Sequence, residues 1–426
     1  MTIATGTTFQ APHTQPNTLR IGGLDGLLYA GLFMLFATSG FVFTEPAPYD
    51  GILILIIGAV VVTGIKVPKF IAPLFVLSCL VAAGHLIGSS QAYDLKYAGV
   101  HALIKLYLSS SVLLFACLAA AKPQRFMTVT MIGTTIAALL TGLAGVIGIL
   151  DLHPKATELF TLYDRAKGGF KDPNVMGPFL ILPVIYGVHQ LLSRPLSRAW
   201  VWLGIIPCLA LAIFLSFSRG AWAHLVLSGA IYLGIYFIMA PSVIARTRAI
   251  VLTGVAIVIM VVGVSFAMGV GKINSLFEQR AALTQSYDTN EKGRFAGQRK
   301  AAQLAAENPG GLGAGGFTNY HGEEVHNVYL NAFMNGGWLA GFSYLALVGA
   351  TIFVGLRAVF IVAPAQPLLM PVYATFLGLA LEGLIIDTDH WRHFYLIVGL
   401  VWGLSAHIMK SGVRTGGNGS IGVQGG

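Results

Sequence analysis

The side chain best placed to move a proton is His326, which begins an apolar run after a long polar segment. Histidine takes up or releases a proton near neutral pH. The sequence HNVYL at 326–330 predicts a helix that starts near His326 and carries His326 and Leu330 on one face. His326 is therefore a candidate general base, and the alternative is a structural histidine at a helix start.

Two arginines could hold a phosphate or diphosphate beside such a base. Arg219 lies in a very short stretch, 216–220, between two apolar runs, and Arg294 opens a predicted helix at 293–306 that Pro309 ends. A guanidinium stays charged and binds phosphate oxygens two at a time. We predict catalytic roles for both, although Arg219 could instead extend toward lipid headgroups.

Other polar side chains could contact the same ligand. In the loop before residue 175, Arg165 and Lys171 could contact the ligand, or they could instead pair with Asp164 and Asp172. A glycine run at 310–316 could cradle a phosphate, but it lacks the spacing and the Lys-Ser/Thr of a P-loop, so a loop that re-enters the membrane edge is favoured. The residues predicted to bind substrate are Arg165, Lys171, Asn174, Arg280, Asn327 and Arg392.

A second polar cluster precedes the last apolar run and comprises Asp387, Asp389, His390, Arg392 and His393, with Glu382 about one turn deeper. Acids inside membranes are usually paired. One interpretation is therefore an ion-pair clasp with Arg392, and the other is substrate binding or an alternative base. Asp387 and Asp389 alone are a weak metal motif, and we expect neither a metal nor a cofactor.

His101 and Lys105 lie one helical turn apart near one end of an apolar run. They could line a groove for a diphosphate-bearing lipid, or Lys105 could pair with a carboxylate such as Glu45. Both interpretations stay open.

These polar residues stand out because the chain is so apolar. Of its 426 residues, 55% are hydrophobic and 10% are charged, whereas soluble domains carry about 25% charged residues. A water-soluble globular enzyme and a disordered chain are thereby excluded. We predict an all-α, polytopic fold with twelve membrane spans, at 22–43, 51–65, 70–89, 98–121, 126–150, 175–192, 199–217, 220–240, 249–271, 333–356, 367–386 and 393–409.

Every second short loop is basic and contains no carboxylate, as at Lys66 and Lys69 or at Arg246 and Arg248. This positive-inside pattern places both termini in the cytoplasm and the long polar loops on the other face. The predicted divisions are a cytoplasmic tail at 1–20, spans one to nine at 21–271, a periplasmic loop subdomain at 272–332, spans ten to twelve at 333–410, and a disordered tail at 411–426.

Four motifs, in this order, resemble the bacterial O-antigen ligase and polymerase family of integral membrane glycan transferases. They are FKDPN at 170–174, SFSRGAW at 216–222, GR at 293–294 opening a helix that ends in NP at 308–309, and HNxxL at 326–330. The resemblance covers roughly residues 20–410. One departure is Gln298, where the family often has a tryptophan four residues after the helix arginine.

The resemblance implies a GT-C-like, metal-independent transferase of the bacterial inner membrane with a periplasmic active site. Such enzymes take a glycan from undecaprenyl diphosphate. A ligase passes it to lipid A-core, and a polymerase passes it to the next repeat unit; the ligase is our lead and the polymerase stays open. His326 would deprotonate the acceptor saccharide while Arg219 and Arg294 stabilise the diphosphate. The expected partners are these substrates and membrane lipids, with no nucleic acid.

A secondary transporter is the rival from another class, because twelve spans suit transporters well. A transporter should show two related halves and charges in broken spans at mid-membrane. This chain has no visible half-to-half similarity, and its chemistry-bearing residues gather at one face. The sequence therefore favours an enzyme over a transporter of polysaccharide precursors.

Overall fold

The computed structural model describes residues 25–240, 242–269, 271–281, 290 and 293–416. Helices make up most of this part, which also contains a short antiparallel hairpin of β1 (Thr161–Leu162) and β2 (Arg165–Ala166). The prediction of an all-α polytopic membrane protein is confirmed. The predicted tail at 1–20 lies outside the described residues, as do the last ten residues of the predicted tail at 411–426, whereas α18 reaches Gly416.

Each predicted apolar run contains a helix. Within the described residues, eight helices are long and apolar enough to cross a membrane, and three shorter apolar helices accompany them. The helices at the predicted runs are α1 (Asp25–Ala37), α2 (Pro48–Thr63), α3 (Ala72–Ser89), α4 (Leu95–Ala121), α5 (Pro123–Ile149), α7 (Pro173–Ser193), α9 (Trp202–Leu215), α10 (Arg219–Met239), α11 (Val243–Met268), α16 (Val328–Val359), α17 (Gln366–Glu382) and α18 (Arg392–Gly416). Shorter elements connect them, namely η2 (Lys69–Ile71), α6 (Pro154–Phe160), α8 (Leu196–Ala199), α12 (Gly271–Ala281), α14 (Arg294–Glu307) and α15 (Thr318–His321).

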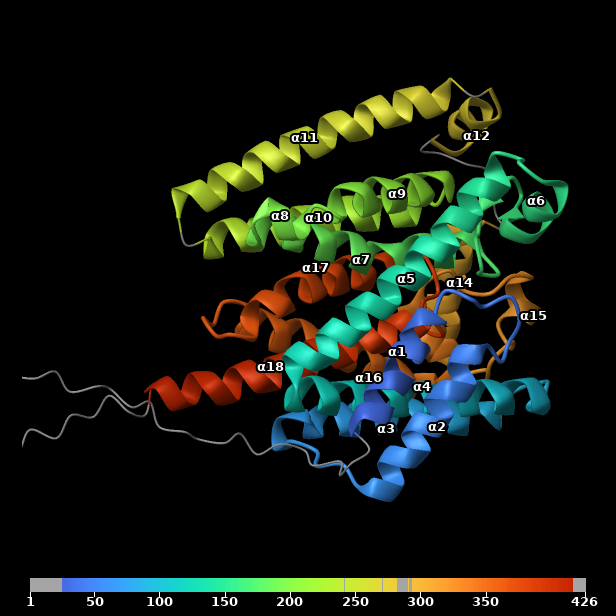
Figure 1. Ribbon diagram of the computed structural model, residues 1–426. Coiled ribbons are helices and arrows are strands. Elements are labelled where there is room, and N and C mark those ends of the chain that lie inside the picture. The colour runs from blue at the N-terminus through green and yellow to red at the C-terminus, as the bar shows by residue number, and fades with distance from the viewer. Residues whose placement is uncertain (1–24, 241, 270, 282–289, 291–292, 417–426) are drawn as a thin grey trace, which may run out of the picture.

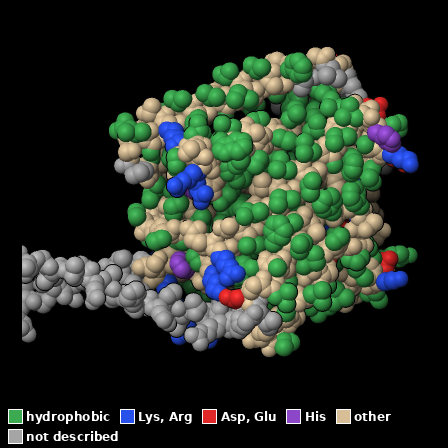
Figure 2. Space-filling view, viewed as in Figure 1, with side chains coloured by type: hydrophobic (Ala, Val, Ile, Leu, Met, Phe, Trp, Pro, Cys, Tyr) green, Lys and Arg blue, Asp and Glu red, His purple; other side chains and the backbone are tan. Residues whose placement is uncertain are grey.

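The long helices form a bundle (Figure 1) in which α16 packs on α3, α18 on α4, and α10 on α17. Helix α11 lies at the edge of the bundle, with its apolar side chains almost wholly exposed. Figure 2 shows hydrophobic side chains across the middle of one face and the few charged side chains toward its two ends. This distribution suits a helix bundle surrounded by lipid.

One end of the bundle carries the long connections, and we call it the loop end. Helices α6, α12 and α15 lie there, opposite the end at which α18 finishes (Figure 1). The connections at the loop end are 38–47, 90–94, 150–172, 216–218, 293–327 and 383–391. Because these connections are far apart in sequence and close in space, the loop end is where the chain can assemble a polar site.

Helix α16 is interrupted at Gly336 and Gly337, where Gly337 has a φ of +64°. The glycine-rich segment after α14 fills the interruption, and the backbone N–H of Leu312 donates to the carbonyl of Met334 at 2.7 Å. A Cβ added at Gly311 would lie only 2.5 Å from the backbone nitrogen of Gly337. Close backbone packing against α16 therefore explains why this segment is rich in glycine.

Candidate functional site

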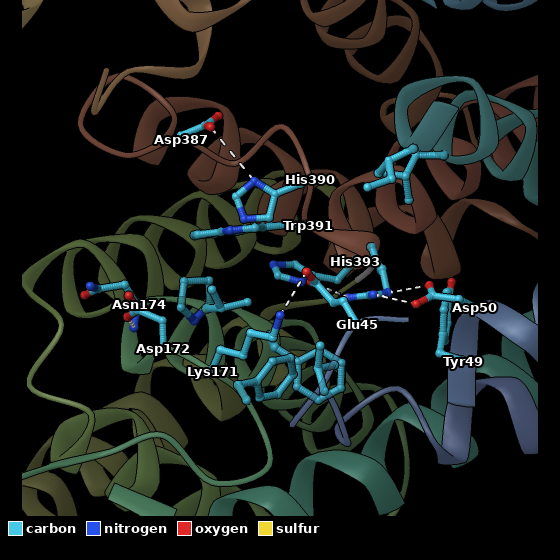
Figure 3. A pocket seen from close by; sticks show the side chains of 18 of the residues that line it. Glu45, Tyr49, Asp50, Lys171, Asp172, Asn174, Asp387, His390, Trp391 and His393 are labelled. Atoms are coloured by element: carbon cyan, nitrogen blue, oxygen red, sulfur yellow. Dashed lines mark hydrogen bonds and ion pairs between the residues drawn. The ribbon is translucent and has the colours of Figure 1, made fainter. Parts of the chain in front are cut away.

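A cavity of about 950 Å³ opens at the loop end. Its walls include the 38–47 connection, α2, α4, the starts of α7, α14, α16 and α18, and the 314–326 segment. Figure 3 shows side chains from these distant segments facing the same space. Five of the predicted site residues line it, namely Lys171, Asn174, Arg294, His326 and Arg392. The structure thus brings the predicted base and three predicted cations into one cavity.

The other four predicted site residues, Arg165, Arg219, Arg280 and Asn327, are not among the described residues that line the cavity. Arg165 is buried behind the cavity. Its Nε donates to the carbonyl of Ser216 at 2.8 Å, and its Nη2 donates to Oδ1 of Asn174 at 2.7 Å. Arg165 therefore joins the start of α7 to the turn before α10.

Arg219 is the first residue of α10, directly after the tight turn that the sequence predicted. The side chain of Ser218 caps the helix by accepting a hydrogen bond from the backbone of Ala221 at 3.4 Å. A Cβ added at Gly220 would lie 2.9 Å from Oε1 of Glu382. The start of α10 is thereby fixed against the buried end of α17.

Helix α16 begins at Val328, close to His326 as predicted, but His326 lies before the cap and so does not share a helix face with Leu330. The cap is Asn327, whose Oδ1 accepts from the backbone of Tyr329 at 3.0 Å and of Leu330 at 3.1 Å. Its Nδ2 donates to the carbonyl of Leu384 at 3.0 Å. Because both ends of the amide are used, Asn327 anchors the connection in which His326 lies.

The imidazole of His326 is half-buried at the cavity, with Nε2 3.7 Å from Oε2 of Glu323. Burial lowers the pKa of His326, and the positive charge of Arg294 lowers it further, against the opposing effect of Glu323. A lowered pKa leaves the imidazole neutral at pH 7. A neutral imidazole can accept a proton, as a general base must.

Gln298 connects α14 to the two connections that carry the site. Its Nε2 donates to the carbonyl of His326 at 2.8 Å and to that of Leu384 at 3.1 Å. Arg294 lies one turn earlier on the same helix and lines the cavity. The residue that marked a departure from the family pattern thus holds the backbone of the candidate base.

Arg392 pairs with Asp50, which is 342 positions away. Its Nε donates to Oδ1 at 2.7 Å and its Nη2 donates to Oδ2 at 2.7 Å. Tyr107 and the backbone of Ala47 also donate to this carboxylate, at 3.0 and 2.7 Å. The interpretation that paired Arg392 with acids of its own cluster is therefore wrong, because its bidentate partner Asp50 lies at the start of α2.

Glu45 extends this network, as Figure 3 shows. Its Oε2 accepts from Nζ of Lys171 at 3.0 Å, and its Oε1 lies 3.8 Å from Nη1 of Arg392. We call Lys171, Glu45, Arg392 and Asp50 the clasp. Sequence reasoning did not assign Asp50 to the site, although an acid at the start of an apolar run is a signal for a buried partner.

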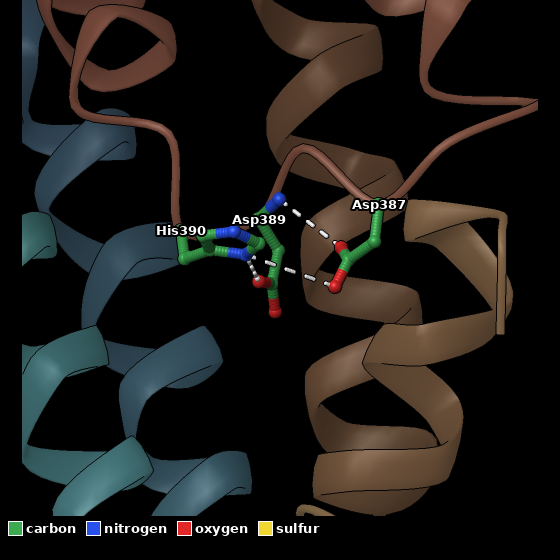
Figure 4. Close-up of side chains that lie close together, drawn as sticks. All are labelled: Asp387, Asp389 and His390. Atoms are coloured by element: carbon green, nitrogen blue, oxygen red, sulfur yellow. Dashed lines mark hydrogen bonds and ion pairs between the residues drawn. The ribbon is translucent and has the colours of Figure 1, made fainter. Parts of the chain in front are cut away.

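Asp387, Asp389 and His390 form a second cluster (Figure 4), with Nδ1 of His390 3.2 Å from Oδ1 of Asp389. Lys105 contacts the Asp389 carboxylate and also donates to the carbonyl of Asp389 at 2.6 Å. Ligand atoms of the three clustered residues lie within 4.8 Å of one another, so they could hold a metal ion. The ammonium of Lys105 already supplies positive charge at this place.

The two carboxyl groups of this cluster differ in their affinity for a proton. Burial raises the pKa of Asp387 to about 7, and the charge of Asp389 adds to the effect. Burial acts in the same direction on Asp389, but the Lys105 ammonium outweighs it and holds the pKa of Asp389 well below its usual range. Asp389 is therefore the ionised partner of Lys105, and Asp387 holds a proton more readily.

Apolar side chains of α2 and α4 continue the cavity toward the surface of the bundle. Ile54, Leu103 and Tyr107 line both this cavity and an adjoining one of about 260 Å³. Ile54 and Leu103 are exposed on the outside of the bundle. A hydrocarbon chain can therefore lie along α2 and α4 while a polar head group occupies the main cavity.

The arrangement combines the parts that transfer from an anionic leaving group requires. Arg294, Lys171 and Arg392 line the cavity beside a neutral imidazole. Cations can stabilise a leaving diphosphate, and the imidazole can accept a hydroxyl proton.

The comparisons with known proteins point to one family. Residues 204–345 match the family model described as O-antigen ligase. The matched region runs from α9 into α16 and contains Arg219, Arg294 and His326. A comparison with curated proteins gives no match.

Proposed function

We propose, because residues 204–345 match the O-antigen ligase family model, that this multi-pass bacterial membrane protein transfers a glycan from undecaprenyl diphosphate to a saccharide acceptor. The lead activity is ligation to lipid A-core at the periplasmic face. The alternative is polymerisation of lipid-linked O-antigen or exopolysaccharide repeat units. The observation that carries the proposal is the single cavity that holds His326 and the cations Arg294, Lys171 and Arg392.

In the proposed reaction, the acceptor hydroxyl attacks the anomeric carbon of the donor sugar. The new glycosidic C–O bond forms as the C–O bond to the diphosphate breaks, and the bonding electrons leave with undecaprenyl diphosphate. The hydroxyl proton passes to the neutral imidazole of His326, whose lowered pKa keeps it available as a base. Positive charge develops on the donor sugar in such displacements.

The developing charge on the diphosphate is stabilised by fixed cations. Arg294 lines the cavity and acts on the pKa of His326, so it lies near the candidate base. Lys171 is half-exposed, and its ion pair with Glu45 can open when a diphosphate arrives. Arg219 lies outside the lining and contributes its charge, together with that of the α10 N-terminus, from the adjoining turn.

The isoprenoid tail of the donor would lie against α2 and α4. The exposed side chains of Ile54 and Leu103 connect the cavity to the surface that faces lipid. This arrangement lets the tail remain in the bilayer while the diphosphate enters the cavity.

We also propose that the reaction needs no divalent metal ion. The cluster of Asp387, Asp389 and His390 has the composition of a cation site, but Lys105 already contacts the Asp389 carboxylate. The ammonium then takes the place that a cation would occupy.

The test uses purified protein in lipid nanodiscs with a synthetic undecaprenyl-diphosphate oligosaccharide and EDTA. Transfer to lipid A-core identifies a ligase, and lengthening of the lipid-linked oligosaccharide without lipid A-core identifies a polymerase. Donor that is carried across a sealed vesicle membrane without transfer would support a transporter instead. A requirement for added Mg²⁺ or Mn²⁺ would overturn the metal-independent mechanism.

A further inference from the structure

One part of the cavity wall presents hydrogen-bond acceptors that lack a partner within the described residues. These atoms are Oδ1 of Asn331, Oδ1 of Asn335 and Oε2 of Glu324, and all three are buried. Asn331 and Asn335 are only 3% and 4% exposed, and all three residues line the cavity. Buried polar atoms in native proteins normally have a partner. A ligand in the cavity is the natural source of the missing donors.

The orientation of the Asn331 amide follows from its neighbour. Its Nδ2 donates to Oδ2 of Asp387 at 2.7 Å. With the amide nitrogen facing Asp387, the amide oxygen Oδ1 has no partner within the described residues. Asn335 follows one turn later on the same face of α16, just before the interruption at Gly336. The two open amide oxygens therefore lie on one helix face.

Glu324 joins this wall to the candidate base. It lies two residues before His326, and two residues of chain span at most about 7 Å. Burial raises the pKa of Glu324, and the charge of Asp389 raises it further. A ligand donor beside this carboxyl group would stabilise its ionised form against both effects. A group that binds Glu324 therefore lies in the same cavity as the imidazole of His326.

We infer that Glu324, Asn331 and Asn335 form the subsite for the acceptor sugar, and that this subsite takes a hexose or hexosamine with free hydroxyl or amino groups in preference to a uronic or phosphorylated sugar. The inference rests on the proposed function and specifies its acceptor. Hydroxyl and amino groups donate hydrogen bonds to the open oxygens, whereas carboxylate and phosphate groups offer only further acceptors. The cations of the cavity remain available for the diphosphate of the donor.

The test compares three disaccharides of equal size as binding probes and as acceptors. They are N,N′-diacetylchitobiose, its fully deacetylated form, and a disaccharide that ends in glucuronic acid. Binding to the protein in nanodiscs is measured by saturation-transfer NMR titration, and transfer is measured with an undecaprenyl-diphosphate oligosaccharide. We expect the first two probes to bind at least about tenfold more tightly than the third, because a carboxylate placed against the open oxygens offers only acceptors and leaves those oxygens unpaired.

The variant Glu324→Gln tests the role of Glu324 directly. The glutamine amide both donates and accepts hydrogen bonds, so it can also bind a carboxylate. We expect it to reduce the preference to about threefold or less and to leave the KM for the donor unchanged. Glu307→Gln is the matched control, since Glu307 is exposed on α14 and hydrogen-bonds Gln303. The comparison of probes in the unchanged protein needs no variant, so it decides the question even if Glu324→Gln does not fold.

Equal binding of the glucuronic acid probe by the unchanged protein would overturn the inference. So would binding and turnover of the donor without detectable binding of any of the three probes, or a preference that Glu324→Gln leaves intact. Failure of the protein to bind or consume the undecaprenyl-diphosphate donor at all is a different result. It would contradict the proposed function itself.

Discussion

The clasp and the loop segment around His326 hold their polar groups in opposite ways. In the clasp, Arg392 donates two hydrogen bonds to Asp50, and Lys171 donates one to Glu45. Each charge therefore already has a partner inside the protein. In the loop segment, the hydrogen bonds from Gln298 and Asn327 go to the backbone. The imidazole of His326 is left facing the cavity.

This difference separates residues that stabilise the fold from residues whose polar atoms can act on a substrate. A buried pair such as Arg392 with Asp50 mainly holds chain segments together, whereas the exposed pair of Lys171 with Glu45 can open to bind a substrate. Side chains that are positioned through their backbone keep their own polar atoms available. We therefore expect changes at the buried pair of Arg392 and Asp50 to affect mainly folding, and changes around His326 to affect mainly the rate of transfer.

The largest effect is expected for His326→Ala. Loss of a general base typically lowers a rate by about 10²–10⁴-fold, and the half-buried ring contributes little to the helix bundle. Transfer from an undecaprenyl-diphosphate donor is measured together with thermal unfolding in detergent. The control is His153→Ala, an exposed histidine at the start of α6. Normal transfer by His326→Ala would remove the imidazole from the mechanism.

The next largest effect is expected for Asp50→Asn, and it concerns stability. Removal of one member of a buried ion pair costs about 3–5 kcal/mol. The side chains of Arg392 and Asp50 retain 17% and 11% exposure, so we expect about 2–4 kcal/mol. The free energy of unfolding in detergent measures the loss. In the double variant Asp50→Leu with Arg392→Leu, much of the stability should return.

The second pair of the clasp is a matched control for the first. Lys171 and Glu45 are 50% and 47% exposed. Exposed pairs contribute about 0–1 kcal/mol, so Glu45→Gln should change the free energy of unfolding by less than about 1 kcal/mol. Equal losses for Glu45→Gln and Asp50→Asn would contradict the view that burial decides which pair holds the clasp together.

The helices were predictable from the sequence because hydropathy reports directly on membrane spans. The apolar runs located each long helix, and the stop at Pro309 located the end of α14 near its observed residue, Glu307. The start of α16 was predicted to within two residues, but the cap was not identified, because His326 and Asn327 are both polar and the choice of cap depends on side-chain hydrogen bonds that a sequence does not show.

The site was predictable only in part. His326 and Arg294 could be proposed from residue type and from the family resemblance, and both line the cavity. The partner of Arg392 could not, because Asp50 lies 342 positions away and only the packing of the helices brings the two together. The partner of Lys105 was missed for the same reason: Glu45 was one candidate, and the structure selects Asp389.

Gln298→Glu should show whether Gln298 positions His326 or binds the substrate. The glutamate is the same size but cannot donate to the carbonyls of His326 and Leu384, and its charge repels both oxygens. We expect kcat to fall by about tenfold while the KM for the donor stays unchanged, because the base moves and the cations do not. Gln303→Ala, on the exposed side of the same helix, is the control. A rise in KM with an unchanged kcat would assign Gln298 to substrate binding.

The smallest effect is expected in the pH dependence of transfer. Burial and Arg294 lower the pKa of His326, whereas Glu323 raises it. Since the base must be neutral, the rate should fall as the pH drops through this lowered pKa and stay flat at neutral pH. Glu323→Gln removes the opposing effect, so the acidic limb should move to lower pH. The Glu323 side chain is 69% exposed, and such a pair is worth about 0–1 kcal/mol, which corresponds to a shift of less than about one pH unit. The pH–rate profile of kcat/KM measures this shift, and movement of the acidic limb to higher pH would show that a group other than His326 controls it.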